Sequence, residues 1–301
     1  MLTVPAIISH YLLSERVRTA LGELQPQLEI HRNAFLWGAS GPDVFFCHRV
    51  LPFQKARSLS CFGSRMHNEP AHRLLNALVE YARAARDDIA MSYALGFITH
   101  YAFDSVAHPF VLYFSGQMSY RQPEKHSSIC HNELEAALDS LFLRVEKGVR
   151  ISRIRLQDAA PIDPEANTVI ALSLKSYMKR AYHFQASCTE LIQAQKDWHT
   201  SLAVLNDRTG MKRIMVEYAE KAVGLKPMLS PMFREDHPRL MPDYANLRRR
   251  QWFDRVQQQE HSETFFELAD RAEALSLELI RQVLAGKPLT AEQCTATFSG
   301  H

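Results

Sequence analysis

The sequence predicts an all-helical protein, and three observations point to that fold class. Apolar residues recur with the helical period in long segments, and no extended alternation of apolar and polar residues predicts a strand. No Asn-Gly or Asp-Gly pair is present to form a tight hairpin turn. Glycine is scarce, at 11 of 301 residues, so few flexible turns are available. We therefore expect a multi-helix core.

Helical periodicity predicts seven segments. In chain order they are Ile7–Leu21, Pro70–Arg86, Asp88–Ala107, Cys130–Glu146, Ala166–Ala194, Lys212–Gly224 and Glu263–Ala285. The first is apolar apart from polar residues such as His10, and the fourth carries Leu134 and Leu138 on one face. Glycines and prolines predict irregular structure over Leu36–Leu59 and over Pro227–Asp243.

The third predicted helix belongs to a long uncharged run. Ile89–Phe114 spans 26 residues without Lys, Arg or Glu, which is enough to cross a bilayer. However, it carries His100, Asp104 and His108 near its middle, and an Asp at the bilayer centre costs roughly 2.5–3.5 kcal/mol. A core helix with one polar stripe is favoured. Because Pro109 disfavours helical geometry at His108, we expect the helix to end there.

Composition narrows the class of protein further. The net charge is +2, too small to indicate a nucleic-acid partner or a membrane surface. Five widely spaced cysteines without a CxxC pair argue against a disulfide framework and a thiolate zinc site, so any metal must take nitrogen and oxygen ligands. No Lys or Arg precedes the apolar N-terminal stretch, so no secretory signal is indicated and a cytoplasmic protein is expected.

Histidine is distributed unevenly along the chain. Nine of the 14 histidines precede a shift in composition near Gly148–Glu165, and the later helices have ordinary amphipathic patterns. We therefore expect residues 1–150 to form a metal-binding helical core. Residues 151–301 are expected to form a helical extension packed on it.

The strongest motif is the series His100, Asp104 and His108. Residues four apart on a helix lie on nearly the same face, so His100 and Asp104 share one stripe of an apolar helix. A lone histidine is most simply a core residue with a satisfied hydrogen bond. A buried carboxylate between two imidazoles, in contrast, needs a cation to offset its desolvation. This cluster therefore favours a metal site.

Other potential ligands are weaker when taken singly. His131 and Glu135 repeat the four-residue spacing, a pattern that a solvated helix face also produces. His10 interrupts an apolar helix, and Asp43 follows Gly41-Pro42 on a tight turn. His67 lies in a short polar segment before the second predicted helix.

The ordered set of motifs resembles the zinc-dependent phospholipase C family, which is related to the S1/P1-type single-strand nucleases. The motifs are His10, Gly41-Pro42-Asp43, His67, His100-x3-Asp104-x3-His108 and His131-x3-Glu135. The resemblance covers about residues 1–150 and implies an all-helical core that binds two or three zinc ions, with manganese or iron as alternatives. The interval from His100 to His108 is two residues shorter than in the secreted phospholipases.

The resemblance also implies a partition of the ligands. One ion would be held by His67, His100 and Asp104, and a second by Asp43, His108 and His131. A third would be held by His10 and Glu135, with Asp104 as a bridge. Asp43 is the expected catalytic residue, which would orient or deprotonate the attacking water.

The function implied is phospholipase C-like hydrolysis of phosphate esters, phospholipids among them, by a zinc-activated hydroxide. Two alternatives remain. A single-strand nuclease or nucleotide phosphohydrolase could use the same scaffold, although no stable nucleic-acid complex is expected. A metal-stabilised binding module without catalysis would have every coordination position filled by protein.

Overall fold

The computed structural model confirms the all-helical class. It describes residues 6–50, 54, 56–123, 125–238, 240 and 243–299. Its α-helices and 3₁₀ helices are α1 (Ile7–Leu24), α2 (Arg32–Ala39), η1 (Gly41–Cys47), α3 (Ser60–His67), α4 (Ala71–Ala85), α5 (Asp88–Arg121), α6 (Ser127–Lys147), η2 (Ile151–Arg153), η3 (Leu156–Ala159), α7 (Pro164–Tyr182), α8 (Cys188–Leu205), α9 (Met211–Ala222), η4 (Ser230–Met232) and α10 (Phe265–Leu284). Two short strands, β1 (Trp252–Asp254) and β2 (Gln259–His261), form a hairpin.

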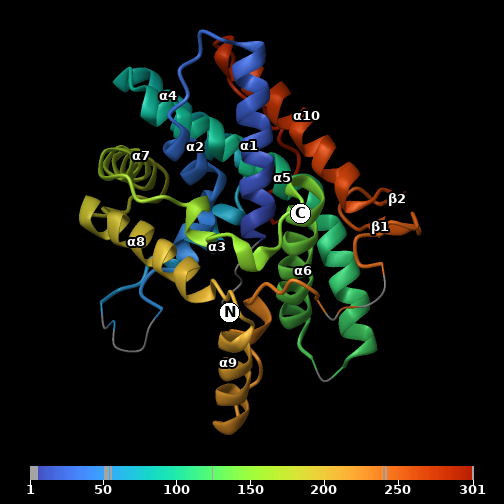
Figure 1. The fold of residues 1–301 in the computed structure, drawn as a ribbon. Helices are drawn as coiled ribbons and strands as arrows, with labels where there is room; N and C mark the ends of the chain where they lie inside the picture. The colour runs from blue at the N-terminus through green and yellow to red at the C-terminus, as the bar shows by residue number, and fades with distance from the viewer. Residues whose placement is uncertain are drawn as a thin grey trace.

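Helix α5 forms the centre of the molecule. It packs against α1, α2, α4, α6, α7 and α10, which surround it in Figure 1. Its crossing with α2 is unusually close, because a Cβ atom at Gly96 would overlap the carbonyl oxygen of Phe35, and one at Gly38 would overlap that of Tyr93. Glycines at both positions let the two backbones touch, which places α2 and the start of η1 over the middle of α5.

The predicted end of α5 at His108 is wrong. The helix continues through Pro109 to Arg121. An internal proline costs about 3 kcal/mol. The following turns bury Phe110, Val111 and Phe114, and burial of one such side chain contributes about 1.5–3 kcal/mol. Burial therefore outweighs the proline, and His108 remains helical.

The predicted helix Ala166–Ala194 is two helices. His183 ends α7 in the left-handed conformation, with φ of 52°. Ser187 then begins α8 with a capping box, in which Ser187 and Glu190 each bind the other's backbone N–H. The capping pattern was present in the sequence, but the helical periodicity on both sides concealed the break.

The stretch Leu36–Leu59, predicted to be irregular, is partly helical. It contains the second half of α2 and all of η1, while residues 51–53 and 55 lie outside the described residues. The hairpin is also absent from the prediction. Its strands have three residues each, and Trp252 pairs with His261 and stacks on its ring at 4.7 Å. Such short strands carry no detectable alternation.

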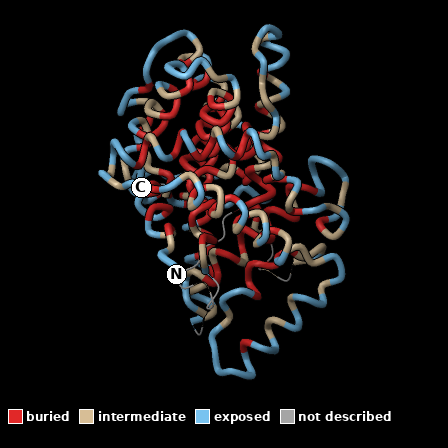
Figure 2. Tube along the Cα trace, turned by 90° about the vertical axis from the view of Figure 1, so that its left-hand side faces the viewer, coloured by how far each residue is buried: buried red, intermediate tan, exposed pale blue. Residues whose placement is uncertain are grey.

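One continuous apolar core joins the two halves of the chain. It extends from Ile7 to Phe298, and α10 packs on both α5 and α1. Figure 2 shows buried residues throughout the middle of the molecule, whereas α9, at the foot of both views, is mostly exposed. The division into a core of residues 1–150 and an extension of residues 151–301 stays a prediction.

Candidate metal centre

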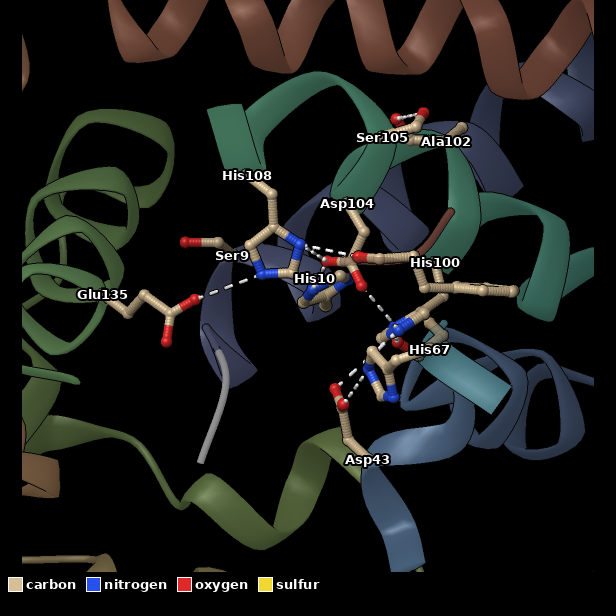
Figure 3. Close-up of polar contacts among 12 residues, drawn as sticks. Ser9, His10, Asp43, His67, His100, Ala102, Asp104, Ser105, His108 and Glu135 are labelled. Atoms are coloured by element: carbon tan, nitrogen blue, oxygen red, sulfur yellow. Dashed lines mark hydrogen bonds and ion pairs between the residues drawn. The ribbon is translucent and has the colours of Figure 1, made fainter. Parts of the chain in front are cut away.

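Helix α5 presents three candidate ligands to the interior. His100, Asp104 and His108 occupy successive turns, and the side chain of Asp104 lies between the two imidazoles (Figure 3). His100 is fully buried and Asp104 is 4% exposed. The continuation of the helix past Pro109 keeps His108 on the same stripe.

Helices α1 and α6 supply three more candidates. His10 lies in the first turn of α1, and His131 and Glu135 lie one turn apart on α6. The start of α1 is fixed to α6 because Ser9 donates from its N–H and its Oγ to Asp139, both at 2.7 Å. Asp139 also accepts from Arg234 at 3.0 Å, so this carboxylate positions α1 rather than facing the candidate ligands.

Asp43 and His67 approach from the opposite side. Asp43 lies in η1, two residues after Gly41, whose φ of 52° is left-handed. A Cβ atom at Gly41 would overlap the ring of His100, so only glycine permits this contact. His67 is the last residue of α3 and donates from Nδ1 to the Gly63 carbonyl at 2.7 Å.

Two carboxylates connect these side chains into a continuous cluster. Asp104 places Oδ1 at 3.0 Å from His10 Nε2 and Oδ2 at 3.0 Å from His100 Nε2. Asp43 places Oδ1 at 3.0 Å from His67 Nε2 and Oδ2 at 3.8 Å from His100 Nε2. Each aspartate therefore faces two histidines with separate oxygens, as a carboxylate does when it bridges two sites.

The donor atoms form three groups of three. They are His10, His100 and Asp104; Asp43, His67 and His100; and His108, His131 and Glu135. The structure therefore brings all eight candidates together, but in a partition different from the one expected. Asp43 joins His67 and His100, and Glu135 joins His108 and His131. The four-residue spacing on α6 explains the second change, because it leaves Glu135 Oε1 only 3.2 Å from His131 Nε2.

Burial and charge shift the ionisation of these groups. Burial alone lowers the pKa of His100, but the carboxylates of Asp104 and Asp43 overcome this effect and raise the pKa to about 9. Burial raises the pKa of Asp104, but His100, His108 and His10 together hold it well below its usual range. Burial likewise lowers the pKa of His131, and Glu135 raises it more. The cluster thus holds Asp104 ionised, and a cation must compete with protons for His100 and His131.

The residues present fit a divalent metal. His100 Nε2 and Asp104 Oδ2 are 3.0 Å apart, yet neither makes a hydrogen bond within the described part of the chain, nor do Asp43 Oδ1 and Glu135 Oε2. Buried atoms of this kind are rarely left without a partner.

The histidine tautomers also fit a metal. His67, His100 and His108 each place Nδ1 against a carbonyl oxygen, of Gly63, Ala39 and Phe298 respectively. A carbonyl can only accept, so Nδ1 is the donor, and Nε2 offers its lone pair to a metal once the imidazole is neutral. This arrangement is usual for histidines that bind metals.

A pocket of about 410 Å³ opens beside the cluster. Its lining includes Asp43, His67, His108, His131 and Glu135. Hydroxyl and amide groups form much of the rest, from Ser64, Asn68, Ser115, Ser127, Ser128 and Ser299. Phe46 and Leu112 add apolar surface. A polar molecule can therefore reach the donor atoms from this side.

The C-terminal segment completes the site, and no sequence pattern indicated it. The carbonyl of Phe298 accepts from His108 Nδ1 at 2.7 Å, and the N–H of Ser299 donates to the His67 carbonyl at 3.1 Å. The buried Phe298 ring lies 5.8 Å from the His100 ring and 6.0 Å from that of His67. Residues 190 positions after His108 and 232 positions after His67 thus fix these two histidines.

The sequence model of the zinc-dependent phospholipase C family matches residues 9–195, more than half of the chain. The chain belongs to this family. All eight candidate ligands of this zinc-dependent phospholipase C family member lie inside the matched region, whereas Phe298 and Ser299 lie outside it. No curated protein and no solved structure matches the chain.

Membership of the zinc-dependent phospholipase C family agrees with the chemistry of the cluster. Imidazole and carboxylate ligands suit zinc, and groups of three leave a coordination position for water or substrate. Within the described residues, none of this family member's helices has both the length and the apolar content needed to cross a membrane.

Proposed function

We propose that this chain hydrolyses phosphate diesters in the manner of a phospholipase C, with divalent zinc held by the three donor groups. One observation carries the proposal: the three groups of donors are adjacent, and two of them contribute side chains to the wall of a pocket of about 410 Å³. An open pocket at incompletely filled donor groups is what catalysis requires, whereas a structural metal is enclosed. This arrangement favours an enzyme over the metal-stabilised binding module.

The donor groups lie at different depths and would have different roles. When bound, zinc would supply hydroxide at neutral pH and positive charge for the phosphate oxygens. His10, His100 and Asp104 would hold an ion in the interior, and His108, His131 and Glu135 would hold one at the pocket.

Asp43 is our candidate catalytic residue. It lies between His67 and His100 and also borders the pocket, and its Oδ1 makes no hydrogen bond within the described residues. A carboxylate in this place can orient the attacking water and accept its proton, in addition to holding a metal.

The pocket wall indicates the type of leaving group. Apart from the candidate ligands, no charged side chain among the described residues lines it, and its other polar side chains are those of five serines and Asn68. Hydroxyls and an amide can hydrogen-bond an uncharged, hydroxyl-bearing alcohol, but they do not provide an ion pair for a second phosphate or an amine. A diester with such an alcohol is therefore the preferred substrate.

The aromatic residues give less support to the nuclease alternative. A nuclease stacks bases on aromatic rings beside its metals. Trp37 and Phe45 are buried in the core, Phe46 lines the pocket, and Phe53 lies outside the described residues. One aromatic ring on the described pocket wall does not make a stacking pair.

The test is metal content followed by activity. Elemental mass spectrometry of protein purified without added metal or chelator should find two or three zinc ions per chain. The same protein should hydrolyse a phospholipid in mixed micelles and bis(p-nitrophenyl) phosphate, lose activity with chelator and regain it with zinc. Single-stranded DNA should be cleaved more slowly.

His237→Ala is the matched control, because this histidine is exposed and belongs to none of the donor groups. Less than half an ion per chain, with no gain on adding zinc or manganese, would exclude the proposal.

A further inference from the structure

Helix α9 exposes an apolar stripe that the fold leaves uncovered. Met211, Ile214, Met215 and Tyr218 are 62%, 64%, 67% and 75% exposed. They are spaced at i, i+3, i+4 and i+7, so they share one face of the helix. Soluble proteins normally bury such a stripe, and a contiguous exposed patch of this kind usually marks an interaction surface.

The apolar surface continues into the segment that follows. Val223 and Leu225 are 69% and 56% exposed, and Met228 and Leu229 are each 46% exposed. Figures 1 and 2 show α9 projecting from the foot of the molecule as a convex arm. We name this surface, formed by the eight side chains just described, the α9 face.

Polar contacts hold the arm in place without covering its apolar face. Asp207 accepts from the N–H groups of Gly210 and Arg213, both at 2.9 Å. Glu220, the one buried residue of α9, accepts from Met228 N–H at 2.8 Å and from Ser230 Oγ at 2.6 Å. An isolated helix of 12 residues is marginal in water, so these contacts are what present the α9 face outward.

Charge on the arm is complementary to an anionic surface. Residues 208–229 carry five basic side chains, Arg208, Lys212, Arg213, Lys221 and Lys226, and two acidic ones, Glu217 and Glu220. Their net charge is +3, which Asp207 at the start of the arm lowers to +2, and Arg213 and Lys221 form ion pairs with Glu235 and Glu217. An amphipathic helix with basic residues beside its apolar face is the form that lies in the interface of anionic membranes.

We propose that the α9 face docks on an anionic phospholipid surface. A convex arm with flexible methionine side chains needs no shaped partner, and a bilayer interface provides none. The ends of α5 and α6 that border the pocket lie toward the same end of the molecule as α9 (Figure 1). The choice of lipid rests in part on the proposed hydrolysis of phospholipids. Docking on the α9 face would bring the pocket close to such a substrate.

The test is co-flotation of the full chain with vesicles of phosphatidylglycerol and phosphatidylcholine. The wild-type protein should bind, and Ile214→Glu/Met215→Glu should bind at least tenfold less, since both side chains would enter the interface. Leu24→Glu/Val145→Glu is the matched control, because both residues are 58% exposed on α1 and α6. Binding of this control should stay within twofold. Arg208→Gln/Lys226→Gln should weaken binding by roughly fivefold per charge, and high salt should act in the same direction.

Three outcomes would overturn the proposal. The first is that the wild-type chain does not bind vesicles, and the second is that the Ile214→Glu/Met215→Glu variant binds as well as the wild-type chain. The third is that the wild-type chain sediments as a dimer and binds no vesicles, while this variant sediments as a monomer. Hydrolysis of bis(p-nitrophenyl) phosphate separates this proposal from the proposed function, since it needs no membrane. If the chain hydrolyses this diester but does not bind vesicles, the proposal for the α9 face fails and the proposed function stands. If the chain binds vesicles through α9 but does not hydrolyse the diester, the proposed function fails and the proposal for the α9 face stands.

Discussion

The two inner donor groups and the outer one use the same kinds of side chain but differ in their surroundings. His100, shared by both inner groups, is fully buried beneath Gly41 and Phe298. In the outer group, the side chains of His108 and His131 are 14% and 16% exposed and face the pocket. An enclosed group loses its ion slowly, whereas an open one can exchange ligands and meet substrate. We therefore expect the inner groups to hold the site together, apart from Asp43 and His67, which also line the pocket, and the outer group to contact the substrate.

The largest effect should come from Asp104→Asn. This change removes the charge that faces His10 and His100, so we expect loss of at least one inner ion and a fall in kcat/KM on the order of a thousandfold. Metal analysis and diester kinetics measure both effects, with His237→Ala as the control. Full metal content together with full activity would show that the site is assigned wrongly.

His131→Ala should separate the outer group from the inner ones. We expect one ion fewer per chain and a fall in kcat/KM of about a hundredfold, with Tm nearly unchanged. The distinction between inner and outer groups predicts that the remaining ions resist chelator as they do in the wild-type protein. If all ions are lost together, the groups act as one unit and the comparison fails.

The metal-free protein should lose stability in mild alkali. The pKa of His100 is raised from its ordinary value near 6.5 to about 9, so its stabilising charge is fully present below about pH 6.5 and is lost as pH rises through 9. The expected loss is roughly 3 kcal/mol in the free energy of unfolding.

Denaturant unfolding of chelator-treated protein between pH 6 and 10 measures this loss. His100→Asn removes the titrating group, and its pH profile should be flatter than that of the wild-type protein. Zinc-loaded protein should not show the same slope, because a metal ligand is already deprotonated. Identical profiles for the wild-type protein and the variant would contradict the expectation.

The smallest effect should come from Phe298→Leu. The shape change should cost about 1 kcal/mol of stability. Because the ring contacts His67 and His100, zinc affinity should also fall about tenfold, as measured by chelator competition.

The control is Phe114→Leu, which alters a similarly buried ring of α5 that lies beyond the donor groups. It should cost similar stability and leave zinc affinity unchanged. Equal zinc affinity in the two variants would show that the C-terminal segment does not position the ligands.

Local sequence patterns predicted most of the helices and the candidate ligands on α5 and α6, while His10, Asp43 and His67 became candidates only through the family resemblance. The spacing of His100 to Asp104 and of His131 to Glu135 is a property of a single helix, so it is visible without a fold. The break between α7 and α8 could have been found from the capping pattern at Ser187 and Glu190. The passage of α5 through Pro109 could not, because it depends on what Phe110 and Phe114 contact in the folded chain.

The sequence by itself determined the helical class, the types of candidate metal donor and the stripe of candidate ligands on α5, because these follow from composition and from the helical period. Only the tertiary structure decided which donors meet. Asp43 joins His67 because η1 lies against α3, and Phe298 covers His100 because the C-terminal segment returns to α5. It also left the α9 face exposed, although its apolar spacing resembles that of a buried helix. Contacts between distant segments depend on packing and long-range hydrogen bonds, and no local pattern encodes them.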